Sequence, residues 1–227
     1  MRLDKYLADM KIGTRSQVKE IIKKGRIKVN NEVIKNSDYK IKESDNVYID
    51  GNKVEYLEYE YIILNKPKGY LSATEDKYDK TIMELINSKR KGLSPVGRLD
   101  KDTEGLILIT NDGKLNHDLL DPKKHVDKKY YVEVDTVLNK DAKEILSKPM
   151  DLGDFIAKPA IYEQIDDYHA YLTISEGKFH QVKRMFEKIG NKVIYLKRIS
   201  FKNLNLNNLQ LGEYRHLTKE ELEELKN

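Results

Sequence analysis

One segment near the middle of this 227-residue chain constrains its fold more than any other. Residues 94–105 place a cluster of ionisable side chains between a proline and two glycines, and they run directly into the apolar segment 106–109. An apolar run of this kind predicts a buried core strand. The charged loop would then be held at the end of a rigid element, which is a common position for functional side chains. A solvated loop is the alternative, and the segment alone does not decide between the two.

The composition removes several classes of active site. The chain contains no cysteine, which excludes disulfides, thiolate metal sites and cysteine nucleophiles and fits a reducing compartment. Neither of the common glycine-rich nucleotide-binding motifs is present, and no serine lies in a nucleophile-elbow pattern. No two of the five histidines are four residues apart, so a zinc site on one helix is not expected. We therefore expect neither a metal nor a cofactor.

Carboxylates and cations remain as the available catalytic groups. A carboxylate such as Asp100 can act as a nucleophile without a general base, because it is already ionised at neutral pH. It works best when it is desolvated and a nearby cation keeps it charged. Arg98 would lie on the same side as Asp100 if the segment is extended. Lys183 flanks the buried face of a predicted helix, but its spacing alone favours a surface lysine.

Positive charge is concentrated at the N-terminus, although the net charge of the whole chain is only +4. Residues 1–28 contain nine bases and three acids, and their apolar spacing predicts two helices followed by a short hairpin. Arg15, Lys19 and Lys23 recur every four residues and would share one face of the second helix. Like charges on one stripe repel each other, which favours a polyanion as partner over a solvated face.

Downstream of residue 60 the pattern alternates between strands and helices. We expect strands near 61–66, 106–110, 130–134, 160–165, 168–175, 193–196 and 198–201, and helices near 115–120, 141–147, 179–189 and from 218. A domain boundary near residues 56–60 would give one domain of residues 1–58 and another of 59–227. The longest apolar runs have four or five residues and the N-terminus lacks a signal-peptide core, so we expect a cytoplasmic protein without a membrane span.

Four motifs follow one another along the chain, at residues 65–69, 97–113, 128–130 and 176–185. Together they resemble the signature of the ribosomal RNA pseudouridine synthases of the RsuA family. The two basic helices and the hairpin of residues 1–58 resemble the alpha-L RNA-binding module, which is the usual companion of this family. The resemblance implies an α+β protein, in which a small N-terminal alpha-L domain precedes a synthase domain built on a mostly antiparallel mixed sheet.

The resemblance also implies roles for individual residues. Asp100 would attack the target uridine, and Lys183 would keep Asp100 charged and oriented. Tyr130 would stack on the uracil, and Arg98 would help to extrude the nucleotide or fill the space that it leaves. Many relatives carry arginine at the position of Lys183, and because lysine lacks the planar fork of arginine, a bidentate pair with Asp100 is not expected. The RNA-binding residues of the N-terminal module would be Arg2, Arg15, Lys19, Lys23, Arg26 and Lys28.

We therefore predict an isomerase that converts one uridine of ribosomal RNA to pseudouridine, acting as a monomer on ribosomal RNA or an assembly intermediate. Segment 115–130 resembles the small-subunit enzymes more than the large-subunit ones, which favours a small-subunit target. The alternatives are a large-subunit synthase of the same family, a non-catalytic RNA-binding or ribosome-assembly protein, and a hydrolase that pairs Asp100 with Asp102 or Glu104. Residues two or four apart in a turn rarely converge in one cleft, which argues against the hydrolase.

Overall fold

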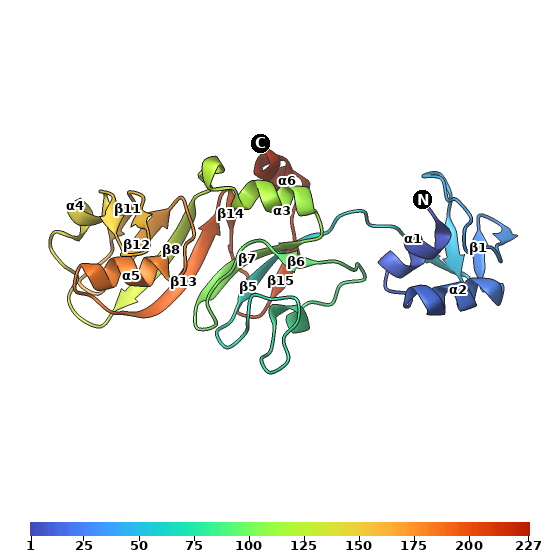
Figure 1. The fold of residues 1–227 in the computed structure, drawn as a ribbon, viewed down its shortest axis with the longest axis horizontal. Helices are drawn as coiled ribbons and strands as arrows, with labels where there is room; N and C mark the ends of the chain where they lie inside the picture. Colours follow the sequence, from blue (N-terminus) through green and yellow to red (C-terminus); the bar gives the residue numbers. More distant parts are fainter. The chain divides into compact units, whose positions relative to one another are not determined.

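The computed structural model describes the whole chain from Met1 to Asn227. Its packing divides it into two compact units (Figure 1). The first comprises Met1–Glu60 together with Asn87–Leu93, and the second comprises Tyr61–Ile86 together with Ser94–Asn227. The short segment 87–93 thus belongs to the N-terminal unit, although it interrupts the sequence of the larger one.

The N-terminal unit consists of two helices and a small antiparallel sheet with the strand order β2-β1-β3-β4. Its elements are α1 (Leu3–Asp9), α2 (Arg15–Lys23), β1 (Ile27–Val29), β2 (Glu32–Val33), β3 (Val47–Ile49) and β4 (Asn52–Val54). The α2 helix begins with a capping box, in which Thr14 and Gln17 satisfy each other's backbone amides. The apolar positions that predicted the two helices form the core of the unit, because Leu3, Leu7 and Val18 are fully buried.

Segment 87–93 is fastened to this unit by hydrogen bonds to the α1 region. The backbone amide of Lys91 donates to Asp9 O at 2.9 Å, and Arg90 Nη1 donates to the same oxygen at 3.1 Å. Lys11 Nζ donates to Ser88 O at 2.8 Å. The Arg90 guanidinium also lies over the ring of Tyr56. Removal of residues 1–58 would therefore strip this segment of its partners.

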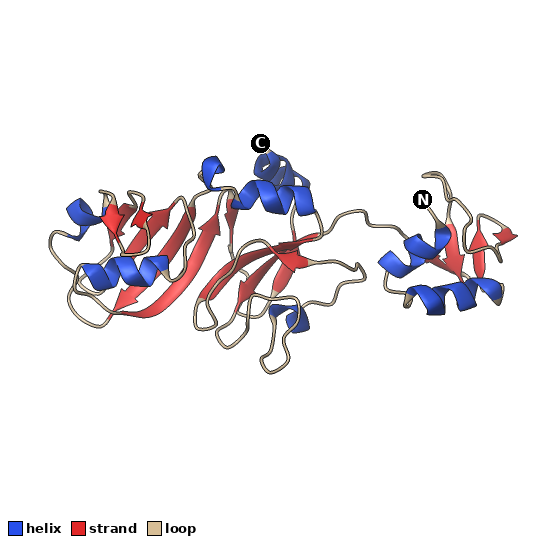
Figure 2. Ribbon diagram, viewed as in Figure 1, coloured by secondary structure: helices blue, strands red, loops and turns tan.

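The larger unit is built on one mixed sheet with the strand order β11-β12-β8-β13-β7-β5-β15 (Figure 2). Its strands are β5 (Tyr61–Lys66), β6 (Ser94–Pro95), β7 (Glu104–Thr110), β8 (Lys128–Val134), β11 (Ile161–Gln164), β12 (His169–Ile174), β13 (Val193–Phe201), β14 (Leu204–Asn205) and β15 (Tyr214–His216). A separate two-stranded sheet pairs β9 (Met150–Asp151) with β10 (Ile156–Ala157). Only β13 and β7 run parallel, and the other neighbours are antiparallel. The predicted α+β class with a mostly antiparallel mixed sheet is confirmed.

Four helices belong to the same unit as this sheet. They are α3 (Gly113–Leu120), α4 (Ala142–Leu146), α5 (Gln181–Lys188) and α6 (Lys219–Lys226), with two short 3₁₀ turns at Ile82–Leu85 and Pro122–Lys124. Side chains of α3 and α6 join Phe201 and the β7 side chains in one apolar cluster. On α5, Phe186 is fully buried and lies against the ring of Tyr162, with a centroid distance of 6.5 Å. No helix is both long and apolar enough to cross a membrane.

The expectation of two separate late strands is wrong, because residues 193–201 form the single strand β13. Lys197, which the prediction left between the two strands, pairs with Glu104 of β7 and Tyr131 of β8, so the strand continues through it. Irregularities in the pairing with β8, at Val193/Tyr195 and at Arg198/Ser200, absorb the change in side-chain pattern without ending the strand.

The strand β7 is buried along its whole length, as its apolar sequence predicts. At its start, Gly105 has φ +108° and pairs with Arg198 of β13. A Cβ atom at this position would lie 2.2 Å from Arg198 O. Only glycine therefore permits the close parallel approach of these two strands, which also fixes the loop that precedes β7.

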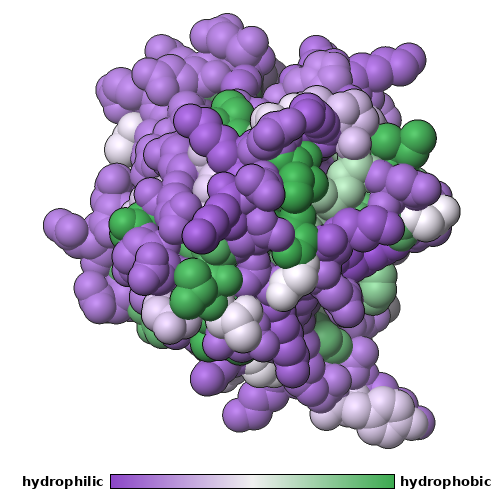
Figure 3. All heavy atoms as spheres, turned by 90° about the vertical axis from the view of Figure 1, so that its left-hand side faces the viewer, coloured by the Kyte–Doolittle hydropathy of each residue, from purple (hydrophilic) through white to green (hydrophobic).

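The outer surface of the sheet end that carries α4 and β11 is largely hydrophilic, with apolar side chains scattered among polar ones (Figure 3). Among them, Ile156 and Ile161 are 67% and 62% exposed. Isolated exposed apolar side chains are normal on a soluble surface. The four residues predicted to be catalytic line one pocket with side chains of β8 and α5.

Candidate active site

Hydrogen bonds to its backbone groups hold the charged loop between β6 and β7 in place. Ser72 Oγ donates to Leu99 O at 2.9 Å and accepts from the Leu99 amide at 3.0 Å. The amide of Gly69 donates to Lys101 O at 2.7 Å. Residues on either side of Asp100 are therefore fixed to the turn that follows β5, which restricts where the Asp100 carboxylate can lie.

Lys66, the last residue of β5, is the strongest restraint on the loop. It is fully buried, and its Nζ donates to Thr103 O at 2.7 Å, to Asp100 O at 3.0 Å and to Pro67 O at 3.2 Å. Burial lowers the pKa of Lys66 to about 8, although the charges of Asp102 and Asp100 oppose the shift. Sequence reasoning assigned no role to this lysine. The available signal was a lysine at the end of an otherwise apolar strand.

Replacement of Lys66 by methionine is expected to loosen the loop, because methionine keeps the length of the side chain but leaves buried carbonyl groups without donors. Unsatisfied buried acceptors cost about 1–3 kcal/mol each, so we expect a loss on the order of 3 kcal/mol in the free energy of unfolding. Denaturant unfolding measures it. The matched control is Lys68→Met on the same turn, where the side chain is exposed. Equal stabilities of the two variants would contradict this role.

The carboxylate of Asp100 faces a lysine and a histidine from the region around the start of α5. Lys183 Nζ lies 3.3 Å from Asp100 Oδ2, and His180 Nε2 lies 3.5 Å from Asp100 Oδ1. The side chain of Asp100 is 29% exposed, so it is partly desolvated but open to a ligand. His180 lies within a motif recognised in the sequence but was not singled out there. Its left-handed backbone, with φ 50°, turns the chain into α5.

Lys183 contacts a second carboxylate as well. Its Nζ lies 2.7 Å and 2.9 Å from the two oxygens of Asp102, which is closer than its distance to Asp100. Burial raises the pKa of Asp102, but the hydrogen bond and charge of Lys183 outweigh it and hold this pKa below its usual value. Both carboxylates reach the same lysine across the turn, but only Asp100 lines the pocket described below, as expected for carboxylates two residues apart.

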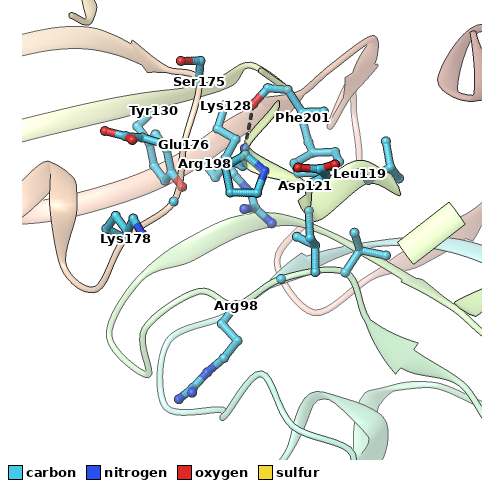
Figure 4. A pocket seen from close by; sticks show the side chains of 16 residues that line it. Arg98, Leu119, Asp121, Lys128, Tyr130, Ser175, Glu176, Lys178, Arg198 and Phe201 are labelled. Atoms are coloured by element: carbon cyan, nitrogen blue, oxygen red, sulfur yellow. Dashed lines mark hydrogen bonds between the residues drawn. The ribbon is translucent and has the colours of Figure 1, made fainter. Parts of the chain in front are cut away.

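Arg98 does not supply the charge that faces Asp100. Residues 98–100 are not part of a strand, so the alternation that would place both side chains on one side does not apply. The Arg98 side chain is exposed and extends away from the other labelled cations of Figure 4. The cations around Asp100 come from the α5 region instead.

The four residues predicted to be catalytic nevertheless line one pocket. This pocket, about 50 Å³ in volume, is lined by Arg98, Asp100, Tyr130 and Lys183 together with His180 and apolar side chains of β12, α5 and β13. Tyr130 lies on the buried face of β8 and is 7% exposed. Asp102 is not among the lining residues, and its side chain is 72% exposed. Asp100 is thus the carboxylate that shares the pocket with an aromatic ring.

Glu104 is engaged elsewhere and does not complete a carboxylate pair. It is buried, and its Oε2 accepts a hydrogen bond from the hydroxyl of Tyr195 at 2.6 Å. Burial together with this bond raises the pKa of Tyr195. Since Glu104 does not line the pocket of Asp100, a hydrolase that uses these two carboxylates together has no support in the geometry.

The six predicted RNA-binding residues fall into two groups. The three bases of α2, Arg15, Lys19 and Lys23, are exposed on the helix, and Lys28 is exposed on β1. Arg2 and Arg26 are already in ion pairs within the unit: Arg2 with Asp4 and Asp38, and Arg26 with Asp50. The α2 bases are therefore the cations more readily available to a polyanion.

Comparison with known proteins agrees with the motifs in the sequence. The RNA pseudouridylate synthase family matches residues 60–188, and the S4 domain matches residues 1–47. The S4 match lies within the region that resembles the alpha-L module. A solved structure described as a pseudouridylate synthase superposes with a TM-score of 0.71 at 37% identity, covering 99% of both chains.

Curated relatives span nearly the full length. Ribosomal small subunit pseudouridine synthase A of Pasteurella multocida is 40% identical and covers 98% of both chains. Ribosomal large subunit pseudouridine synthase B of Bacillus subtilis is 37% identical over 99% of this chain and 95% of its own length. An RNA pseudouridine synthase of Aquifex aeolicus is 42% identical over 100% of this chain and 96% of its own length. The chain therefore belongs to the RNA pseudouridylate synthase family, as an isomerase with an N-terminal S4 domain.

Proposed function

We propose that this enzyme converts one uridine of small-subunit ribosomal RNA to pseudouridine, with Asp100 as the nucleophile. The observation that carries the assignment is the pocket in which the Asp100 carboxylate faces Lys183 and His180 beside the ring of Tyr130. A carboxylate kept ionised by adjacent cations is a competent nucleophile at neutral pH. The reaction needs no oxidant or reductant, since one bond to the ribose is exchanged for another.

The reaction breaks the bond between ribose C1′ and uracil N1, turns the base and joins C1′ to C5. The proton leaves C5 and N1 gains one, so atoms and charge balance. The bond that Asp100 forms with the substrate on attack breaks again before the product is released, so the free carboxylate is regenerated. Lys183 and His180 hold the Asp100 carboxylate oriented for attack, and Lys183 stabilises the charge that develops on this carboxylate as it leaves the substrate.

Tyr130 and Arg98 serve the entry of the base. Extruding a nucleotide costs a few kcal/mol of stacking and pairing. Stacking on an aromatic ring returns about 1–3 kcal/mol per base, and the ring of Tyr130 is the aromatic surface of this pocket. Arg98 lies exposed at the same pocket, where its guanidinium can occupy the space that the extruded base leaves in the RNA.

Segment 115–130 supports a small-subunit target, because it follows the pattern of those enzymes and leads directly into Tyr130. It comprises α3, the turn Pro122–Lys124 and the start of β8. Lys123 and Lys124 are exposed on this turn, and Pro122 lines a pocket that also contains Tyr130. Residues of this segment can therefore contact nucleotides next to the target.

The proposed target is tested by assaying the purified enzyme on deproteinised small-subunit RNA, on small-subunit assembly intermediates and on large-subunit RNA. We expect pseudouridine at one position of the small-subunit RNA, free or partly assembled. Pseudouridine only in large-subunit RNA would contradict the proposed small-subunit target but would leave the proposed reaction unchanged. No pseudouridine in any of them would contradict the proposed function.

The exposed bases of α2 give a separate prediction for RNA affinity. The triple replacement of Arg15, Lys19 and Lys23 by glutamine should weaken binding and reduce the slope of log affinity against log salt by about two to three, since each phosphate contact contributes about 0.7–0.9. Titration at several salt concentrations measures this slope. The control replaces the exposed Lys140 and Lys143 by glutamine. An unchanged slope in the triple variant would show that the α2 bases are only solvated.

A further inference from the structure

A second pocket lies next to the one that contains Asp100. Its volume is about 170 Å³, and it shares Arg98, Tyr130, Gly177 and Lys178 with the first pocket. Figure 4 shows that its side chains come from the end of α3, from β8 and from β13. The mechanism above uses none of the groups that belong to this pocket alone. It therefore requires its own explanation.

Two buried cations line this pocket, Lys128 and Arg198, which are 7% and 2% exposed. Lys128 Nζ donates to Val126 O at 2.6 Å, and Arg198 Nε donates to Leu106 O at 2.7 Å. Neither cation forms an ion pair, although the carboxylates of Asp121 and Glu176 line the same pocket. The buried Arg198 Nη2 has no hydrogen-bond partner. Burial lowers the pKa of Lys128 to about 8, and the charge of Arg198 adds to the shift.

Such an arrangement is costly in the absence of a ligand. Buried charges are normally paired, and an unpartnered buried donor costs about 1–3 kcal/mol. The sheet nevertheless brings these cations together, because Arg198 is paired with Tyr130 in the register of β13 and β8. The nearby irregularity at Arg198/Ser200 allows Phe201 to lie beside them, and both cations are within 5.5 Å of the centroid of its ring. A ligand that accepts hydrogen bonds would satisfy the remaining donors.

The walls of the pocket indicate what kind of acceptor fits. Leu119, Val126 and Phe201 give it apolar and aromatic surfaces, which suit the faces of a nucleobase better than a phosphate. The two cations offer only donors, so the base edge must present two adjacent acceptors. Guanine does so with O6 and N7, whereas adenine and cytosine carry an amino donor on the corresponding edge and uracil has only the single acceptor O4 there. Guanine is thus the base whose edge matches the cations.

We propose that this pocket binds the guanine of a nucleotide adjacent to the target uridine, through Arg198 and Lys128. The inference rests on the proposed function, because the neighbour is defined by the uridine held at Asp100. Tyr130 contributes to both pockets and so separates the two bases. The site would select the RNA by the sequence around the uridine and not only by its shape, in addition to the sequence-independent contacts of the basic S4 domain.

The experiment combines a change in the RNA with a change in the protein. Short RNAs that contain the modified uridine carry guanine or 7-deazaguanine, which lacks the N7 acceptor, at each neighbouring position in turn. For the unaltered enzyme we expect 7-deazaguanine at one position to lower kcat/KM about tenfold. For Arg198→Gln we expect kcat/KM to be low with both RNAs and nearly equal between them. Lys128→Gln provides the same comparison should Arg198→Gln fail to fold.

The ratio between the two RNAs separates recognition from a structural role. If Arg198 only supported the sheet, its replacement would lower kcat/KM on both RNAs and keep the tenfold ratio, which would overturn the proposal. The pocket would bind a phosphate, and the proposal would also be overturned, if a different comparison depended on Arg198. In that case replacing a neighbouring phosphate by methylphosphonate would lower kcat/KM for the unaltered enzyme but not for Arg198→Gln, and 7-deazaguanine would have no effect. A target uridine without guanine on either side would overturn the proposal as well. Failure of the unaltered enzyme to modify any RNA would count against the proposed function instead.

Discussion

Asp100→Asn should abolish pseudouridine formation while leaving the fold and RNA binding intact. Asparagine keeps the shape of the side chain and removes the negative charge that faces Lys183 and His180. Loss of a nucleophile lowers turnover on the order of 10⁴-fold or more, because the remaining groups only bind and orient the substrate. Single-turnover assays give the rate, and titration with RNA gives the affinity.

The matched control for this variant is Asp102→Asn. Asp102 also contacts Lys183, but its side chain is 72% exposed, and exposed ion pairs contribute only about 0–1 kcal/mol. We therefore expect its activity to fall by less than about tenfold. Equal losses in the two variants would show that the charge of the pair matters and not Asp100 itself. Full activity in Asp100→Asn would show that Asp100 is not the nucleophile.

Lys183→Ala is expected to have the second largest effect, and to act on rate more than on affinity. Its Nζ lies between the carboxylates of Asp100 and Asp102, so its loss leaves two negative charges without their shared cation. Removing one preorganised charged group costs roughly 10²–10³-fold in kcat. RNA affinity should stay within about threefold, because the proposed partner is a carboxylate and not a phosphate.

Lys183→Arg tests whether charge alone is sufficient. Arginine keeps the positive charge and adds a planar fork that can bridge two carboxylates. We expect it to retain more activity than Lys183→Ala, with the same RNA affinity. A Lys183→Ala enzyme that turned over normally but bound RNA weakly would place this lysine on the RNA backbone. Measuring kcat and Kd separately for each variant distinguishes the two roles.

The regular elements of the fold could be predicted from local pattern. The run at 106–109 is apolar at every position and became the fully buried β7, and the alternation after Lys128 became β8. The terminal helix predicted from residue 218 was likewise visible in the sequence and is α6. These features depend on neighbours along the chain, which is why periodicity identifies them.

Features that depend on distant parts of the chain could not be predicted in this way. Lys66 donates hydrogen bonds to carbonyl groups more than thirty positions away, and Arg198 of β13 pairs with residues of both β7 and β8. Segment 87–93 packs against α1, to which no local signal connects it. The contact of Lys183 with both Asp100 and Asp102 joins α5 to a loop about eighty positions earlier, which their spacing could not indicate. Tertiary contacts decided each of these positions.

The central claim is that Asp100 of this protein modifies one uridine of small-subunit ribosomal RNA. Its most direct test is to map pseudouridines in ribosomal RNA from cells that lack the gene and carry either the unaltered protein or Asp100→Asn. We expect one small-subunit position to lose its pseudouridine on deletion, to regain it with the unaltered protein and to remain uridine with Asp100→Asn. Restoration of that pseudouridine by Asp100→Asn, or no change in small-subunit RNA on deletion, would contradict the claim.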